Sequence, residues 1–107
     1  MKQIIIESAK NVFQAASLKK TILASAESCT GGMLSTAITD IPGSSTVFEC
    51  GFVTYSNLSK MRLLGVREET LKTFGAVSEE VAAEMAIGAL YNSKANLAIS
   101  ITGVAGP

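Results

Sequence analysis

The sequence contains no histidine, and this absence narrows the chemistry that the chain can perform. A Ser-His-Asp triad, a Cys-His pair, a histidine-ligated zinc ion and a histidine general base are all excluded within these 107 residues. If the chain is a catalyst, its base is therefore a lysine, a tyrosine, a glutamate or an aspartate.

Cysteine, net charge and long apolar runs are also scarce or missing. The two cysteines, Cys29 and Cys50, are too few for a disulfide scaffold or a zinc ribbon and are expected to be free thiols. Nine basic and nine acidic residues cancel, which disfavours nucleic-acid binding because such domains usually carry a basic surplus. No apolar run approaches the ~20 residues of a membrane span. Glu7 and Lys10 interrupt any signal-peptide core, so we expect a cytoplasmic protein without a membrane partner.

Apolar residues make up 48% of the chain, which is enough for one packed domain over residues 1–107. Helical and buried-strand patterns alternate, which predicts an α/β fold, a layered α/β/α sandwich with a mixed, partly parallel sheet. Expected helices cover residues 3–17, 33–38, 58–64, 67–74 and 78–93, and expected strands cover residues 21–26, 47–55 and 96–102. A Gly-Pro turn after a buried strand normally introduces another element, so we expect the domain to be incomplete after Pro107.

The stretch 24–32 joins the first expected strand to a helix through small residues and paired glycines. A helix start there would expose unpaired backbone N–H groups and the positive end of the helix dipole, which suit a phosphate, a carboxylate or an oxyanion. Ser28 stands at the mouth of this candidate site. On the local pattern alone, a helix cap at Ser28 or Thr30 is the better fit than a nucleophile.

A second group of candidate residues follows the second expected strand. Tyr55 lies at its carboxyl end and Lys60 about one helical turn further on, and ligands of open α/β sheets bind outside these strand ends. Taken alone, the two residues are more typical of a solvated lysine and a rim tyrosine than of a site. Ser44 and Ser45 offer hydroxyls for a phosphate, although turn chemistry is their more ordinary role.

Three segments, residues 26–32, residues 55–57 with Lys60, and residues 102–107, together resemble the C-terminal domain family of the competence/damage-inducible protein CinA. The resemblance also includes residues 42–45 and 75–80, in the same order and spacing, and it covers residues 24–107. Enzymes of this family are nicotinamide-mononucleotide deamidases. The resemblance therefore implies hydrolysis of the nicotinamide mononucleotide amide to nicotinic acid mononucleotide and ammonia, with no metal or organic cofactor.

Site residues follow from the same resemblance. It implies Ser28 as the nucleophile, with Lys60 and Tyr55 as the polar partners that activate it or handle the proton. The substrate-binding residues that it implies are Glu27, Thr30, Gly31, Gly32, Ser44, Thr102, Gly103 and Gly106. A cap or a salt bridge is the ordinary alternative for Glu27. Family members continue past Pro107, so the residues that would bind the ribose and phosphate of the substrate are not identified by the resemblance. An unfinished sheet edge favours a homo-oligomer.

A Ser-Lys pair is a known solution for acyl transfer without histidine. The lysine must be neutral, and lowering its pKa from ~10.4 toward ~7–8 costs about 4 kcal/mol, which desolvation and a helix N-terminus are expected to supply. The N–H groups of residues 29–32 are candidate oxyanion donors. Tyr55 either donates to the oxyanion or relays a proton, and Cys29 is the rival nucleophile. The alternative functions are a non-catalytic nucleotide-phosphate binding module, or inactive fragment of the enzyme, and a nucleic-acid-associated competence factor.

Overall fold

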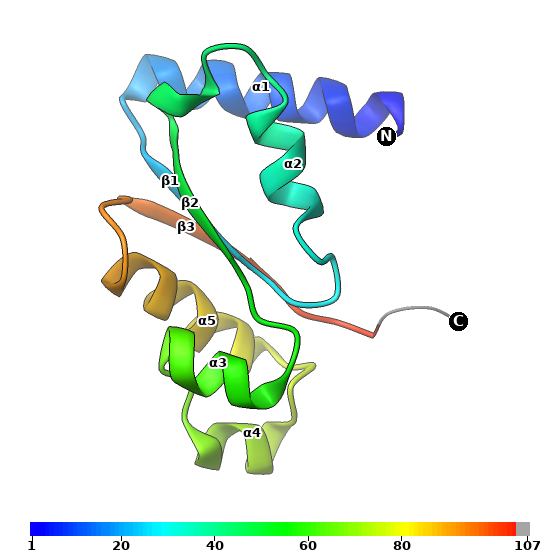
Figure 1. Ribbon diagram of the computed structural model, residues 1–107, viewed down its shortest axis with the longest axis vertical. Coiled ribbons are helices and arrows are strands. Elements are labelled where there is room, and N and C mark those ends of the chain that lie inside the picture. Colours follow the sequence, from blue (N-terminus) through cyan, green and yellow to red (C-terminus); the bar gives the residue numbers. More distant parts are fainter. Residues whose placement is uncertain (105–107) are drawn as a thin grey trace.

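Three parallel strands form the centre of the molecule, and the computed structural model describes residues 1–104 (Figure 1). The strands are β1 (Leu23–Glu27), β2 (Phe48–Val53) and β3 (Leu97–Ile101), in the order β2-β1-β3. A mixed sheet was expected, whereas both strand pairs in the described part of the chain are parallel. The reason is that helices carry the chain back across the sheet between successive strands, so that each strand starts from the same edge.

Helices cover both faces of this sheet, which confirms the layered α/β/α class (Figure 1). Helices α1 (Gln3–Lys19) and α2 (Met33–Thr39) lie on one side. Helices α3 (Asn57–Leu64), α4 (Glu68–Phe74) and α5 (Glu79–Tyr91) lie on the other. A short 3₁₀ turn, η1 (Ser44–Thr46), precedes β2.

The side chains of β1 alternate between these two layers, as the period of a strand requires. Ala24 and Ala26 belong to the apolar core beneath α3 and α5. Leu23 belongs to the core beneath α1 and α2. Ser25 and Glu27 face α2 as well, where they contact Ser35 rather than apolar groups. All five residues are buried, so β1 is the central strand on which both cores are built.

Serine side chains cap both of the helices that flank the site. The Ser56 hydroxyl accepts a hydrogen bond from the Ser59 N–H at the start of α3, and Gly65 ends that helix. The Ser78 hydroxyl likewise accepts from the Val81 N–H at the start of α5. Each cap satisfies one N–H that the helix leaves unpaired, which fixes where the helix begins.

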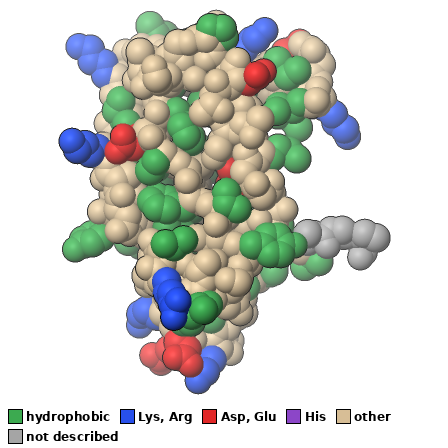
Figure 2. Space-filling model, viewed as in Figure 1, with side chains coloured by type: hydrophobic (Ala, Val, Ile, Leu, Met, Phe, Trp, Pro, Cys, Tyr) green, Lys and Arg blue, Asp and Glu red, His purple; other side chains and the backbone are tan. Residues whose placement is uncertain are grey.

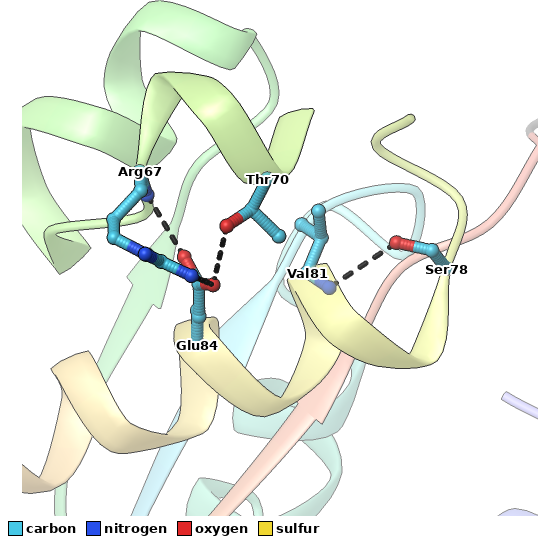
Figure 3. A network of polar contacts seen from close by, with 5 residues as sticks. All are labelled: Arg67, Thr70, Ser78, Val81 and Glu84. Atoms are coloured by element: carbon cyan, nitrogen blue, oxygen red, sulfur yellow. Dashed lines mark hydrogen bonds and ion pairs between the residues drawn. The ribbon is translucent and has the colours of Figure 1, made fainter. Parts of the chain in front are cut away.

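A polar network holds α4 against α5 (Figure 3). One Glu84 oxygen accepts from the Arg67 backbone N–H at 2.8 Å, and the other accepts from the Thr70 hydroxyl at 2.6 Å. Burial raises the pKa of Glu84, but these hydrogen bonds and the Arg67 guanidinium outweigh it and leave the pKa lowered. The network thereby positions the 75–78 segment that joins α4 to α5.

On the face shown in Figure 2, lysine and arginine side chains lie apart at the periphery and do not form a stripe. The bottom of this view, near α3 and α4, carries acidic side chains among the basic ones. None of the helices described is long and apolar enough to cross a membrane.

Candidate active site

The carboxyl ends of the three strands bring the candidate residues to one edge of the sheet. Ser28 follows β1, Thr54 follows β2 and Thr102 follows β3. The Ser28 N–H donates to the Ile101 carbonyl at 2.9 Å, which ties it to β3. Parallel strands end at the same edge, so residues far apart in the sequence meet there.

Lys60 lies at the centre of this edge, and its side chain is only 1% exposed. Its Nζ atom is 2.8 Å from the Ser28 Oγ, 2.8 Å from the Thr54 carbonyl oxygen and 3.1 Å from the Tyr55 carbonyl oxygen. Helix α3 begins directly after the β2 end, and the Ser56 cap fixes its first turn, so that Lys60 reaches back to the strand ends. The structure therefore places Lys60, one of the two expected polar partners, in contact with the expected nucleophile Ser28.

The surroundings of Lys60 favour its neutral form. Burial lowers the pKa of its amine, opposed by Coulombic attraction to Cys29. A neutral amine has two N–H donors and one lone pair. In the structure the Lys60 Nζ donates to the Thr54 and Tyr55 carbonyls and to the Ser28 Oγ. Once the amine has lost a proton, the two carbonyls can keep its two N–H groups, and the lone pair then faces the Ser28 hydroxyl. This is the arrangement that a lysine base requires.

A cavity of about 190 Å³ opens beside this pair. Its lining residues are Ser28, Cys29, Tyr55, Asn57, Lys60, Ala76, Thr102 and Gly103. Larger hollows lie elsewhere, one of about 640 Å³ along α3 and α5 and one of about 320 Å³ between α1 and α2, and neither includes the Ser-Lys pair. The chemistry of the lining side chains therefore selects the smaller cavity.

Sequence reasoning missed two lining residues and one backbone group. Asn57 lines the cavity, and its place in the 55–57 segment that carries the family resemblance is the signal that could have found it. Ala76 carries no functional group that a pattern could reveal. The Thr54 carbonyl contacts Lys60, and no side-chain pattern marks a carbonyl group.

Three of the predicted residues line the cavity in different ways. Tyr55 stands at the rim with its residue 67% exposed, while its carbonyl accepts from Lys60. The Thr102 hydroxyl donates to the Ala76 carbonyl at 2.8 Å and so closes the wall between β3 and the 75–78 segment. A Cβ atom at Gly103 would lie 3.2 Å from the Cys29 sulfur, so a side chain there would press on the thiol.

The start of α2 differs from the anion site that the sequence predicted. Glu27 is fully buried, and its carboxylate accepts from the N–H groups of Leu34 and Ser35 and from the Thr30 hydroxyl. The positive end of α2 is thus occupied by a carboxylate of the protein, and Glu27 is the helix cap given above as its ordinary alternative. The ligand-facing helix end expected from residues 24–32 is not what the structure shows. The physical reason is that α2 begins five residues after Ser28, which lets Glu27 fold back onto its first turn.

The glycines make this turn possible. Gly31 and Gly32 have φ angles of 61° and 109°, in the left-handed region that side chains disfavour. The Gly31 N–H donates to the Ser28 carbonyl, whereas the N–H groups of Cys29, Thr30 and Gly32 have no acceptor within residues 1–104. These three groups are the remaining candidates for oxyanion donors.

Five of the predicted binding residues do not line the cavity, namely Glu27, Thr30, Gly31, Gly32 and Ser44. The Ser44 hydroxyl donates to the Thr39 carbonyl at 3.3 Å, in η1 before β2. Because β1 and β2 are parallel, the start of β2 is at the opposite edge of the sheet from Ser28. Gly106 lies outside the described residues. Within residues 1–104, no group of three His, Cys, Asp or Glu side chains is placed to hold a metal ion.

The fold and the site define a class: a parallel α/β/α sandwich with a buried Ser-Lys pair at the carboxyl edge of its sheet. The sequence profile of the CinA C-terminal domain matches residues 6–107. The chain belongs to the CinA C-terminal domain family.

Individual relatives agree with this assignment. The Nicotinamide-nucleotide amidohydrolase PncC of Escherichia coli K12 is 53% identical over 103 residues, which are 96% of this chain and 62% of that protein. A CinA-like protein of Chlorobium phaeobacteroides is 62% identical over 85 residues, 79% of this chain and 20% of the relative. The crystal structure of the competence/damage inducible protein CihA from Agrobacterium tumefaciens has a TM-score of 0.96 at 48% identity, over 100% of this chain and 65% of that one. The chain thus spans less than two thirds of the length of these relatives.

Proposed function

We propose that this chain carries the active site of an amidohydrolase that converts nicotinamide mononucleotide to nicotinic acid mononucleotide and ammonia, a step in pyridine-nucleotide recycling. The observation that supports it most directly is the buried contact of 2.8 Å between the Lys60 Nζ and the Ser28 Oγ at the wall of a cavity. The choice of substrate rests on the name of the Escherichia coli relative, a nicotinamide-nucleotide amidohydrolase.

In the first half of the proposed reaction, neutral Lys60 takes the proton of the Ser28 hydroxyl as the oxygen attacks the amide carbon of the substrate. The carbonyl oxygen becomes an oxyanion, to which the free N–H groups of Cys29 and Thr30 can donate, each worth about 3–4 kcal/mol. Protonated Lys60 then gives its proton to the amide nitrogen. The C–N bond breaks, ammonia leaves, and the acyl group stays on Ser28.

In the second half, a water molecule replaces ammonia. Lys60 takes a proton from this water as the oxygen attacks the acyl carbon, and it returns the proton to Ser28 as the acid leaves. One water is consumed and one ammonia is released in each cycle. Tyr55, at the rim, is proposed to donate to the oxyanion or to relay a proton between Lys60 and the substrate.

The size of the cavity bears on which part of the substrate it holds. About 190 Å³ suits one aromatic ring with its carboxamide, since sites for larger ligands usually measure about 300 Å³ or more. Ala76, Thr102 and Gly103 form the wall opposite Lys60 in the proposed complex. The ribose and the phosphate then extend out of the cavity.

The test is ammonia release from nicotinamide mononucleotide by this chain, with Ser28→Ala as the paired variant and Cys29→Ala as the discriminator between nucleophiles. We expect Ser28→Ala to abolish turnover and Cys29→Ala to keep most of it. Activity that survives Ser28→Ala but is lost in Cys29→Ala would move the chemistry to the thiol. A ligand-induced rise in melting temperature without ammonia release would instead support the binding-module alternative, and the assay would then be repeated with a chain of the full length of the relatives.

A further inference from the structure

Glu27 is the second fully buried charged residue of the site, and the proposed reaction does not use it. Its carboxylate receives four hydrogen bonds. The Thr30 hydroxyl and the Leu34 N–H donate to Oε1 at 2.8 and 2.9 Å, and the Ser35 N–H and hydroxyl donate to Oε2 at 3.0 and 2.8 Å. All four donors come from the turn after Ser28 and the first residues of α2.

A buried hydroxyl pair extends this set of contacts beneath α2. The Ser35 hydroxyl donates to Glu27, so its oxygen accepts from the Ser25 hydroxyl at 2.8 Å. Gly51 on β2 leaves the space for this pair, because a Cβ atom there would collide with both hydroxyl oxygens. The contacts thus run from the middle of β1 to the turn that carries Ser28.

The backbone at the end of β1 is held from both sides. The Glu27 carbonyl accepts from the Thr54 N–H of the β2 end at 2.8 Å, and the Ser28 N–H donates to β3. These bonds fix the end of the strand within the plane of the sheet. The Glu27 side chain fixes the following turn on the α2 side, while Lys60 contacts Ser28 from the side of α3.

Glu27 is separate from the substrate cavity and from Lys60. It is not among the lining residues of the cavity, and its four contacts are made with residues 30–35. Lys60 makes its own contacts with Ser28 and with two backbone carbonyls. A negative charge at Glu27 therefore acts on the geometry of the turn rather than on the base.

We propose that Glu27 is a positioning residue, whose carboxylate clamps the first turn of α2 so that the Ser28 hydroxyl and the N–H groups of Cys29 and Thr30 are held in their reactive positions. This inference rests on the proposed Ser28 chemistry. It also means that the N-terminus of α2 is already neutralised and does not bind the phosphate of the substrate. A misplacement of about 1 Å in such a site costs on the order of 100-fold in rate.

The test compares Glu27→Gln with Glu84→Gln. Glu84 is the matched control, because its carboxylate also accepts from a backbone N–H and a hydroxyl at a helix start, in the α4–α5 network. Each variant is checked by circular dichroism and assayed below its melting transition. The first readout is the rate at which a small fluorophosphonate labels Ser28, which requires a reactive serine but no nucleotide. The second set of readouts is measured with nicotinamide mononucleotide as substrate and comprises kcat, KM and the midpoint of the pH profile of activity.

We expect Glu27→Gln to slow labelling and kcat together by 10-fold to 100-fold, with KM and the pH midpoint unchanged, and Glu84→Gln to label within twofold of the parent. Labelling and kcat of Glu27→Gln equal to those of the parent would reduce Glu27 to a structural cap. An increase in KM alone would make it a substrate ligand, and a shifted pH midpoint would make it a partner of Lys60. Each of these outcomes overturns the proposal.

Two further outcomes separate this inference from the deamidase proposal. Should Glu27→Gln not fold, Ser35→Ala is used instead. It removes one of the four contacts, the hydroxyl bond to Oε2, and keeps the Ser35 N–H bond to the same oxygen, so the same slowing is expected at a smaller size. Failure of Ser35→Ala to slow labelling would then contradict the proposal. Labelling of the parent at Ser28 without any ammonia release would refute the substrate assignment while leaving the positioning role of Glu27 measurable.

Discussion

Glu27 and Lys60 lie on opposite sides of the end of β1, and both are almost completely buried, but their surroundings act on their charges in opposite ways. Burial raises the pKa of Glu27, yet four donated hydrogen bonds more than offset this and hold the pKa below its usual value. Burial lowers the pKa of Lys60, with only the attraction of Cys29 opposing it. The surroundings therefore favour the charged form of Glu27 and the neutral form of Lys60, each relative to the free side chain.

The difference teaches that burial alone does not decide what a charged residue does. A carboxylate whose two oxygens both accept hydrogen bonds has a structural role, because fixed donors stabilise its charged form. An amine whose contacts are two carbonyls and a serine hydroxyl can exchange a proton with that serine. The following predictions test this contrast.

The largest effect is expected for Lys60→Met, which keeps the length of the side chain and removes the base. Turnover should fall by about 10²-fold to 10⁴-fold in kcat, the usual contribution of general acid-base catalysis. The measurement is ammonia release at saturating substrate. Lys72→Met is the control, since Lys72 is exposed and its ion pair is with Glu68 on α4. A Lys60→Met enzyme with near-normal kcat would remove lysine from the mechanism.

The second effect concerns pH. Only the neutral form of Lys60 accepts the serine proton, and its pKa is lowered, so kcat/KM should rise about tenfold per pH unit and level off below the usual lysine value of ~10.4. The measurement is the pH profile of the parent chain. Lys60→Arg should be inactive at every pH, because a guanidinium keeps its proton. A rate that is flat from pH 6 to 10 would contradict a lysine base.

The third effect is on acid stability and concerns the other member of the pair. Because the pKa of folded Glu27 is lowered, its stabilisation is complete above the unfolded pKa of ~4.3 and is lost as the pH falls through the folded value. We expect about 1–3 kcal/mol of the unfolding free energy to disappear in this range. Urea denaturation at pH 7 and at pH 3 measures the difference in unfolding free energy between the two pH values. Glu27→Gln should make this difference smaller. An equal pH dependence in parent and variant would show that Glu27 is not the group that titrates.

The smallest effect is expected for Ser56→Ala, which removes the cap of the helix that carries Lys60. The free energy of unfolding should drop by about 1 kcal/mol, as for other helix caps. Thermal denaturation measures this change, and Ser78→Ala, which removes the cap of α5, is the comparison. If the α3 cap also places Lys60, Ser56→Ala should lower kcat a few-fold more than Ser78→Ala does. Equal kcat values would limit the cap to stability.

Much of the fold could be predicted because its signals are local. The apolar stripe of α1, the caps at Ser56 and Ser78, and the stop at Gly65 depend on residues within one or two helical turns. The parallel orientation of the strands could not be predicted from local signals. The orientation of β3 depends on the three helices that lie between β2 and β3 in the chain.

The candidate site could be predicted only in part, because only some of its residues lie in local motifs. Ser28 and Lys60 could be named from their motifs, but their contact joins two residues 32 positions apart and depends on the pairing of β1 with β2. Ser44 shows the limit of such reasoning, since its hydroxyl looks like a phosphate ligand and lies at the opposite edge of the sheet.

The α/β class and the exclusion of histidine chemistry follow from the periodicity and the composition of the sequence. Ser28 and Lys60 were singled out by the resemblance to the CinA C-terminal domain family. Only the tertiary structure decided that Glu27 fills the N-terminus of α2 and that Lys60 is held by two backbone carbonyls. The physical reason is that desolvation and hydrogen bonding depend on the groups that packing brings together, and the charge state of a buried residue follows from those neighbours.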